Sequence, residues 1–234
     1  MLCIDIIDWG NFKFYLIQLK KMKKILLIGS NSDIATSLLK EDKFEFITLS
    51  SKTSNFNILD KLTFPTLNSI DGLVYFPGSI NLKPFNNLNE KDFQKDYEIN
   101  VLGLINCLQF YHKSFNQNSS IVTISSIAAN FGMPFHASIS ICKSGVEALT
   151  KSLAAEWAPK IRLNCIAPSL VSTKLSERLI NSEIKKENIS KKHPLKRIGN
   201  TNDISNTISF LLSEKSKWIT GQIIRVDGGL SNIR

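Results

Sequence analysis

Residues 121–173 read IVTISSIAANFGMPFHASISICKSGVEALTKSLAAEWAPKIRLNCIAPSLVST. The stretch opens and closes with short apolar runs, which predict strands over Ser120–Ser125 and Arg162–Ala167. Between them lies an amphipathic segment, which predicts a helix over Ser140–Trp157. A strand, a helix and a second strand in this order are typical of a βαβ unit, in which the two strands lie parallel in one sheet.

The same alternation of apolar runs and amphipathic segments extends over the rest of the chain. At 234 residues the chain suits a single domain. The expected fold class is therefore α/β: a Rossmann-type doubly wound parallel sheet with helices on both faces, in three α/β/α layers. The further strands predicted are Lys24–Ile28, Glu45–Leu49, Gly72–Phe76 and Gln222–Val226, and the further helices are Asp33–Lys40, Glu90–Ser114 and Asn202–Leu212.

The net charge of +9 raises the question of an anionic partner, because clustered Lys and Arg attract phosphates. The lysines are instead spread along the chain. The densest cluster, Lys20, Lys21, Lys23 and Lys24, has no interleaved aromatic side chains. We therefore expect a solvated, lysine-rich surface, with no nucleic acid and no membrane as a partner.

The four cysteines are Cys3, Cys107, Cys142 and Cys165, and they show neither CxxC spacing nor paired histidines. Disulfide frameworks and zinc sites both require such patterns. We therefore expect no disulfide, no metal site and a reducing, cytoplasmic location.

The first 21 residues read MLCIDIIDWGNFKFYLIQLKK, and Asp5, Asp8 and Lys13 interrupt their apolar runs. The runs are too short for a membrane span of roughly 20 residues, and the charges lie in the wrong order for a secretory signal. MKKILLIG at Met22 is a typical opening for a nucleotide-binding domain. We therefore expect 1–21 to be an extension that is not native, and the domain to span 22–234.

Several positions in and after 121–173 resemble the short-chain dehydrogenase/reductase (SDR) family. That family pairs a serine, a tyrosine thirteen residues later and a lysine four residues after that, and the serine and lysine positions hold Ser126 and Lys143. The tyrosine position holds Ile139, which carries no ionisable proton. PSLVST at 168–173 and the closing TGQ and DGG motifs within 220–229 are also similar to the family.

The resemblance extends from Lys24 to Leu230 and implies a dinucleotide site. The family's glycine loop reads TGxxxGxG, whereas GSNSDIA at 29–35 keeps only the first glycine, with Asp33 and Ala35 at the other two places. A carboxylate at a helix start competes with a phosphate for the same electropositive end, unless it caps the helix with its side chain turned aside. The loop residues implied to bind the cofactor are Gly29, Ser30, Asn31, Ser32, Asp33 and Ile34.

The second predicted strand runs into Ser50, Ser51 and Lys52, with no acid among them. An acid there would bond the ribose 2′-hydroxyl of NAD and repel the 2′-phosphate of NADP, so NADP is favoured and NAD is the alternative. Besides Ser50 and Lys52, the cofactor-binding residues implied by the resemblance are Asn57, Ile58, Pro77, Gly78, Lys143, Pro168, Val171 and Thr173.

Carbonyl reduction leaves developing negative charge on oxygen, so the site needs an acid and hydrogen-bond donors. By resemblance, Ser126 would bond the substrate oxygen, Lys143 would hold the nicotinamide ribose and Asn100 would anchor a water relay. Ile139 leaves the acid missing. His136, seven residues before Lys143, is the candidate substitute, because histidine as a residue type can act as an acid near neutral pH. A water held by Ser126 and Lys143, with His136 in a structural role, is the alternative.

The polar, lysine-rich segment 174–197 lies where substrates enter a doubly wound fold, so it is a candidate substrate lid; an ordinary surface helical hairpin is the alternative. The implied function is an NAD(P)-dependent oxidoreductase that reduces a carbonyl or enoyl small-molecule substrate with NADPH. The alternatives are a catalytically impaired dinucleotide-binding subunit with a regulatory or partner role, and a nucleic-acid or other interaction protein. The resemblance also implies a homo-oligomer, a dimer or tetramer, paired through Glu90–Ser114 and Ser140–Trp157.

Overall fold

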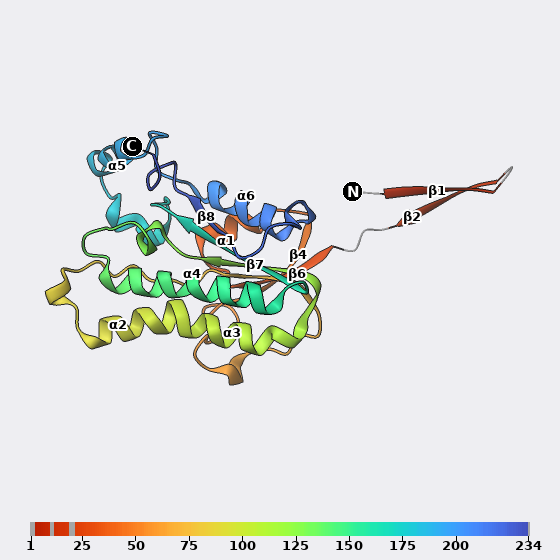
Figure 1. Ribbon diagram of the computed structural model, residues 1–234, viewed down its shortest axis with the longest axis horizontal. Coiled ribbons are helices and arrows are strands. Elements are labelled where there is room, and N and C mark those ends of the chain that lie inside the picture. The colour runs from red at the N-terminus through yellow and green to blue at the C-terminus, as the bar shows by residue number, and fades with distance from the viewer. Residues whose placement is uncertain (1–2, 10–11, 19–21, 234) are drawn as a thin grey trace.

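The computed structural model describes residues 3–9, 12–18 and 22–233, with side chains for 22–233. Its main sheet has six strands in the order β4-β3-β5-β6-β7-β8, and each neighbouring pair is parallel (Figure 1). All the strands predicted from the sequence are present. Their bounds are β3 Lys23–Ile28, β4 Phe44–Leu49, β5 Ile70–Tyr75, β6 Phe115–Ile124, β7 Ile161–Pro168 and β8 Ile223–Val226.

Helices cover both faces of this sheet. α1 and α6 lie side by side on one face, α2, α3 and α4 lie on the other, and α5 lies at the edge of the molecule (Figure 1). The three layers and the parallel sheet confirm the predicted Rossmann-type α/β domain. The bounds are α1 Asp33–Leu38, α2 Glu90–Tyr97, α3 Gly103–Tyr111, α4 Ala137–Trp157, α5 Glu183–Lys192 and α6 Thr201–Leu212.

The unbroken apolar run of β3 follows from its central place in the sheet. Ile25 and Leu27 belong to the hydrophobic core on one face, whereas Leu26 and Ile28 belong to the core on the other. All four side chains are completely buried. Successive side chains of a strand point to opposite faces, so a parallel strand covered by helices on both sides needs apolar residues at every position.

Two helices begin where paired polar residues satisfy their first N–H groups. At the start of α2, Asn89 Oδ1 accepts from the Asp92 N–H at 3.1 Å, and the Asp92 carboxylate accepts from the Asn89 N–H at 3.1 Å. Asn200 and Asp203 repeat this arrangement at the start of α6. Such reciprocal caps leave fewer orphan donors and fix where each helix starts.

The long helix predicted over Glu90–Ser114 has the expected bounds, but it is not one α-helix. α2 passes into a π-helical turn over Glu98–Leu102, α3 follows, and a 3-10 turn closes the run at His112–Ser114. A π-turn inserts an extra residue without interrupting the apolar pattern for long, so periodicity does not reveal it. π-turns are rare overall, and those that occur are often found at functional sites.

Two other predicted helix bounds were wrong. α4 begins at Ala137 instead of Ser140, because Ser138 and Ile139 are buried in its first turn. α1 ends at Leu38 instead of Lys40, and Lys40 lies in the turn that follows. The segment 174–197, for which the sequence offered a lid or a helical hairpin, contains a 3-10 helix over Lys174–Leu179 followed by α5.

The N-terminal residues form their own small sheet. β1 (Cys3–Trp9) and β2 (Phe12–Gln18) pair antiparallel and are separate from the main sheet. That 1–21 is an extension that is not native stays a prediction. No helix in the described part of the chain has the length and apolar character needed to cross a membrane.

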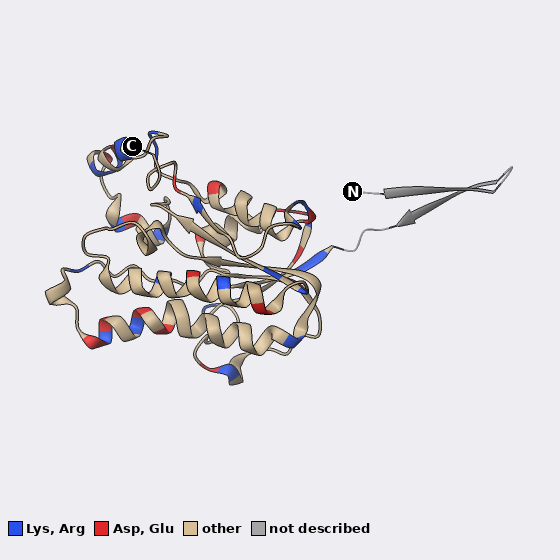
Figure 2. Ribbon diagram, viewed as in Figure 1, with Lys and Arg blue, Asp and Glu red and all other residues tan. Residues whose placement is uncertain are grey.

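The charged side chains are distributed over the structure (Figure 2), and three of the four cysteines are buried. Lys and Arg occur on several helices and loops, with acidic residues among them (Figure 2). Cys107, Cys142 and Cys165 are buried free thiols. The side chain of Cys3 lies outside the described residues.

The order of the strands reverses at β3, because the chain adds β4 on one side of it and then returns to add β5 on the other. β3 pairs with β4 on one side and with β5 on the other. In open α/β sheets, ligands bind outside the carboxyl ends of the strands at this switch point. The loops that follow β3, β5, β6 and β7 therefore form the place to look for a site.

Gly72 in β5 is expected to be sensitive to an added methyl group, because the nearest atom is a backbone oxygen of the neighbouring strand. A Cβ there would lie 2.6 Å from Ser120 O and 2.9 Å from Ile25 Cδ1. We expect Gly72→Ala to lower the free energy of unfolding by about 1–3 kcal/mol through overpacking, as measured by urea denaturation. Gly132→Ala is the control, because a Cβ at Gly132 meets nothing within 4 Å. Equal stability of the two variants would contradict this packing.

Candidate active site

The turn after β3 has the tight packing expected of a glycine loop. Gly29 has a φ of 77°, and a Cβ there would lie 2.9 Å from Pro77 Cδ. The N–H groups of Gly29 and Ser30 both donate to Leu49 O, at 2.8 and 3.3 Å, and Ile34 packs into the core beneath α1. The turn is therefore held between the ends of β4 and β5, where only glycine fits.

Asp33 does not cap α1. Ser32 is the N-cap, and its Oγ accepts from the Ala35 N–H at 3.1 Å. The Asp33 carboxylate accepts from the Lys174 N–H at 2.6 Å. Asp33 thus ties the glycine loop to the segment after β7; its carboxylate bonds this segment, but it does not cap the helix as the sequence-based alternative expected.

The residues assigned to the adenosine half of the cofactor follow β4. Asn31 Nδ2 donates to Ser50 Oγ at 2.9 Å, so these two predicted site residues are in contact, and Lys52 is exposed beside them. Asn57 is exposed, whereas Ile58 packs against the start of α3. The side chain of Ile58 therefore has a packing role whether or not a nucleotide is bound.

The turn after β5 brings two predicted catalytic residues together. A Cβ at Gly78 would lie 3.4 Å from Asn100 Oδ1 and 3.5 Å from Lys143 Nζ. Asn100 lies in the π-turn and Lys143 lies on α4. Asn100 Oδ1 is buried and has no hydrogen-bond partner within residues 22–233. A buried acceptor left free in this way marks a place for a ligand or water.

Lys143 is almost fully buried, with 7% of its surface exposed. Its Nζ donates to Ile124 O, at the end of β6, at 2.9 Å. Burial lowers the pKa of Lys143 to about 8, although nearby acidic groups that include Asp96 partly offset the effect. The amine therefore titrates far closer to neutral pH than an ordinary lysine does.

Ser126 lies at the carboxyl end of β6, in a loop held from both sides. Its Oγ accepts from the Ala128 N–H at 3.2 Å, which leaves the hydroxyl hydrogen able to donate to a substrate oxygen. Ser125 Oγ donates to the buried Glu147 carboxylate at 2.8 Å, and Asn130 Nδ2 donates to the other oxygen of Glu147. Glu147 thus fixes the loop that carries Ser126.

Two hydroxyl groups near the site, those of Ser138 and Tyr75, are engaged in hydrogen bonds within the protein. Ile139 is 6% exposed and lies in the first turn of α4. The neighbouring Ser138 hydroxyl donates to Asp96 Oδ2 at 2.6 Å. Tyr75 at the end of β5 donates to Ile99 O at 2.6 Å, and burial raises its pKa well above the ordinary value of 10.0.

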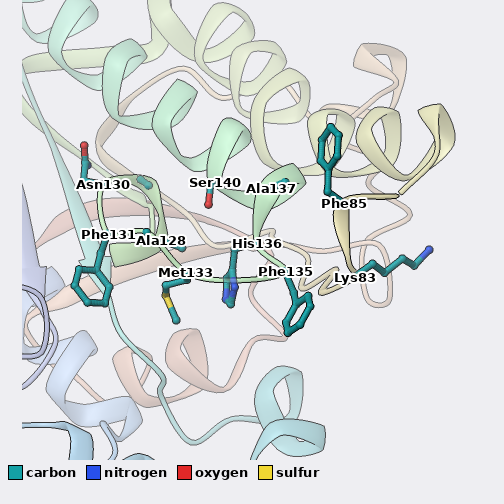
Figure 3. Close-up of a pocket in the computed structure, with 12 residues that line it drawn as sticks. Lys83, Phe85, Ala128, Asn130, Phe131, Met133, Phe135, His136, Ala137 and Ser140 are labelled. Carbon is teal, nitrogen blue, oxygen red and sulfur yellow. The ribbon is translucent and has the colours of Figure 1, made fainter. Parts of the chain in front are cut away.

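The loop between β6 and α4 borders an apolar cavity of about 380 Å³. Its lining includes Phe131, Met133 and Phe135 from this loop, with Lys83 and Phe85 from the segment after β5. Figure 3 shows the Phe131, Met133 and Phe135 side chains along one side of the cavity. The cavity could take an apolar group of a small molecule.

His136 lies on the lining of this cavity and immediately precedes α4 (Figure 3). Its Nδ1 is 2.7 Å from Pro134 O, which places the ring hydrogen on Nδ1 and leaves Nε2 as the free nitrogen. Ser140 lines the same cavity, whereas Ser126 and Lys143 are absent from the described residues that line it. A catalytic role for His136 stays a prediction.

The loop after β7 holds the residues assigned to the nicotinamide. Pro168 ends β7, and Val171 is buried and forms a parallel bridge with Gly199. That bridge uses the N–H groups of Ser172 and Gly199 rather than that of Val171. The Thr173 hydroxyl is 3.2 Å from the hydroxyl of the buried Ser176. The loop is therefore held by contacts within the chain.

The fold is of the Rossmann-type α/β class, and similarity to known proteins identifies its family. A family model described as "Enoyl-(Acyl carrier protein) reductase" matches residues 52–231. 3-Oxoacyl-(acyl-carrier-protein) reductase FabG of Staphylococcus epidermidis is 33% identical over 165 residues, which are 69% of this chain and 67% of that protein. The chain belongs to the SDR family of oxidoreductases.

Other known proteins are also similar to the chain. Tropinone reductase-like 3 of Erythroxylum coca is 36% identical over 140 residues, which are 60% of this chain and 54% of that protein. A solved structure of ElxO with NADP bound has a TM-score of 0.79 and 25% identity, and the match covers 90% of this chain and 99% of that one. An SDR from Brucella melitensis has a TM-score of 0.77 and 24% identity, covering 89% and 96%.

Several polar residues near the site were missed from sequence. Ser79, Asp96 and Glu147 are joined to predicted site residues or their neighbours by hydrogen bonds. His193 is 1% exposed, and its Nε2 is 2.9 Å from Ser169 Oγ in the loop after β7. Acidic and polar residues at helix positions look solvent-exposed in a sequence, so only the buried placement identifies them.

The buried amine of Lys143 is expected to make stability depend on pH. Because its pKa of about 8 in the folded protein is below the unfolded value of 10.5, the folded state holds this proton less tightly. Stability is therefore reduced below pH 8 and recovers as pH rises toward 10.5. Relative to Lys143→Met, the wild-type free energy of unfolding should rise by on the order of 2 kcal/mol between pH 7 and pH 10.

Urea unfolding of both proteins at the two pH values measures this change. Lys151→Met is the control, since Lys151 is exposed on the same helix and should show no such difference. If the difference in the free energy of unfolding between wild type and Lys143→Met stays constant with pH, the pKa of Lys143 is not lowered by folding.

Proposed function

We propose that this protein is an NADPH-dependent oxidoreductase that reduces a carbonyl or enoyl group of a small-molecule substrate. The observation that carries the proposal is the placement of Asn100 Oδ1 and Lys143 Nζ around Gly78, beside the Gly29 turn. The names of the similar proteins, a 3-oxoacyl reductase and a tropinone reductase-like protein, support the reaction class.

The residues around the switch point fit a dinucleotide. Glycine at positions 29 and 78 leaves space that a Cβ would fill, and Asn100 Oδ1 is a buried acceptor without a partner in the described chain. The absence of an acid after β4 supports NADP over NAD, as does the similarity to ElxO with NADP bound. Ser50 and Lys52 would hold the 2′-phosphate, Lys143 the nicotinamide ribose, and Val171 and Thr173 the carboxamide.

When bound, NADPH would supply a hydride to the substrate carbon. Negative charge then develops on the substrate oxygen, and the Ser126 hydroxyl donates to that oxygen. Lys143 keeps its positive charge below a pKa of about 8, and its Nζ lies at the Gly78 turn, as does Asn100 Oδ1. The proton reaches the oxygen either from a water held by Ser126 and Lys143 or from His136, which would stand in for the phenol that Ile139 lacks.

The second candidate is a dinucleotide-binding subunit with impaired catalysis and a regulatory or partner role. The buried, non-ionisable side chain of Ile139 favours it. Catalysis is favoured by Ser126 and Asn100, which binding alone does not require. The two candidates differ in a measurable property, the rate of substrate-dependent NADPH oxidation.

The apolar cavity supports a substrate with an apolar group next to its reducible carbon. Phe131 and Phe135 in its lining are 39% and 55% exposed, more than aromatic side chains of a closed core would be. The segment 174–197 would then be a substrate lid, with Asp33 bonded to its first residue.

We also propose a homo-oligomer, a dimer or tetramer, that pairs through the layer formed by α2, α3 and α4. This layer exposes apolar surface: Ile141 on α4 is 64% exposed and Tyr97 on α2 is 42% exposed. Such residues are typical of surfaces that a second subunit covers.

Ile139→Tyr is expected to raise the rate of NADPH oxidation with ketone or enoyl thioester substrates by about 10²-fold or more, because it restores an acid at the position four residues before Lys143. Ile139→Phe is the matched control, since it adds the ring without the hydroxyl. Stopped or continuous absorbance assays with a panel of ketones, quinones and enoyl thioesters measure the rates. No gain over Ile139→Phe would show that the missing phenol is not what limits turnover.

His136→Ala decides between the two proton sources. A loss of about 10²-fold in turnover is expected when His136 is the acid, with little change in the affinity for NADPH. Ser140→Ala is the control, because Ser140 lines the same cavity. Activity equal to wild type would remove His136 from the mechanism and leave the water.

NADPH is expected to bind more tightly than NADH. Lys52→Ala should reduce the ratio of the two dissociation constants by about threefold to fivefold, which is the effect of losing one exposed ion pair. Lys40→Ala, which changes an exposed lysine after α1, is the control. Calorimetric or fluorescence titration gives the dissociation constants. Binding of neither nucleotide at millimolar concentration would contradict the dinucleotide site itself.

A further inference from the structure

A buried carboxylate, that of Asp96, lies beneath the candidate active site with no cation paired to it. Asp96 is 1% exposed, and none of the ion pairs among the described side chains includes it. Ser79 Oγ donates to its Oδ1 at 2.5 Å, and Ser138 Oγ donates to its Oδ2 at 2.6 Å. A carboxylate is costly to bury unless it is well hydrogen-bonded, so its place here calls for a reason.

The two serines link Asp96 to the parts of the chain that form the site. Ser79 directly follows Gly78 after β5, and Ser138 directly precedes Ile139 in the first turn of α4. Asp96 itself lies on α2, four residues before Asn100 in the π-turn. One carboxylate therefore joins three segments that are distant in sequence.

The Asn100 amide is linked to this carboxylate through Ser79: Asn100 donates to the Ser79 hydroxyl, and the hydroxyl donates to Asp96. Asn100 Nδ2 donates to Ser79 Oγ at 2.9 Å and to the Asp96 backbone oxygen at 2.8 Å, so both amide hydrogens are used. Ser79 accepts from Asn100 because its own hydrogen is donated to Asp96. A flipped amide would turn Asn100 Oδ1 toward Ser79, whose hydrogen is engaged, and toward a carbonyl that cannot donate.

We propose that Asp96 is a positioning residue: through Ser79 it fixes the Asn100 amide so that Oδ1 lies at the Gly78 turn, where Lys143 Nζ also lies, and through Ser138 it holds the start of α4. The inference rests on the proposed oxidoreductase function for its catalytic consequence. Asp96 is bonded to Ser79 and Ser138 and acts on the reaction only through Asn100 and Lys143. Without the carboxylate, Ser79 is free to rotate and donate, and the Asn100 amide loses its single preferred orientation.

Hydrogen exchange of the Asn100 side-chain amide tests the positioning without any need for turnover. In ¹⁵N NMR spectra of the full chain, Asn100→Asp identifies the resonance by removing it. We expect Asp96→Asn and Ser79→Ala to speed exchange by about tenfold or more, because each breaks the ordered hydrogen bonds. Glu90→Gln is the control, an acid-to-amide change at an exposed position of the same helix.

Kinetics test the consequence for the site. We expect kcat for NADPH-dependent reduction to fall by about 10²-fold in Asp96→Asn and Ser79→Ala, because misplacement of about 1 Å in a catalytic group has an effect of that size. KM for NADPH should stay within about twofold of wild type, since neither residue is assigned to the cofactor. A variant that only weakened the fold would also lower the apparent kcat at unchanged KM, so each kcat is calculated per NADPH-binding site, counted by titration of the same sample.

Each outcome has a separate meaning. Unchanged amide exchange in both Asp96→Asn and Ser79→Ala overturns the inference, whatever the activity. Faster exchange with unchanged kcat in an active enzyme also overturns it, because positioning would then have no catalytic effect. If wild type does not oxidise NADPH with any substrate, the proposed function fails, and amide exchange alone still decides whether Asp96 orients Asn100. If Asp96→Asn does not fold, Ser79→Ala carries both measurements.

Discussion

The parallel pairing of β5 with β3 on one side and β6 on the other is the constraint on which the site depends. Ile28, Tyr75 and Thr123 are aligned across these strands. The turns that follow therefore leave the sheet at the same edge and at the same height. The glycine loop, the Gly78 turn and the loop of Ser126 meet for this reason, although about a hundred residues separate the first from the last.

Buried charge is concentrated at this edge. Asp96, Lys143 and Glu147 are each at most 7% exposed, and each is held by backbone carbonyls, serine hydroxyls or an asparagine rather than by an oppositely charged side chain. Hydrophobic residues would fill the same space at lower cost in stability. The presence of the three charged side chains near the Gly78 turn is explained best by the groups that they orient, namely Asn100, the amine of Lys143 and the Ser126 loop.

The strands, the parallel sheet and the glycine turn were all predictable from sequence, because burial on both faces demands continuous apolar runs and a tight turn demands glycine. The π-turn at Glu98–Leu102 and the early start of α4 were not. Both depend on which residues face the protein interior: Ser138 and Ile139 read as ordinary loop or helix residues until their burial is known. The hydrogen-bond partner of Asp33 could not be predicted either, because only the fold brings the backbone N–H of Lys174 to its carboxylate.

The sequence by itself determined the fold class, the family and the absence of a tyrosine at position 139, because each depends on residue type and local spacing. Only the tertiary structure decided which polar groups act together. Asp96 lies seventeen residues after Ser79 and forty-two before Ser138, and its carboxylate bonds both. Contacts at such separations depend on how helices pack on the sheet, and no local pattern encodes that packing. The same reason explains how Asn100 and Lys143, on different helices, both come to lie beside Gly78.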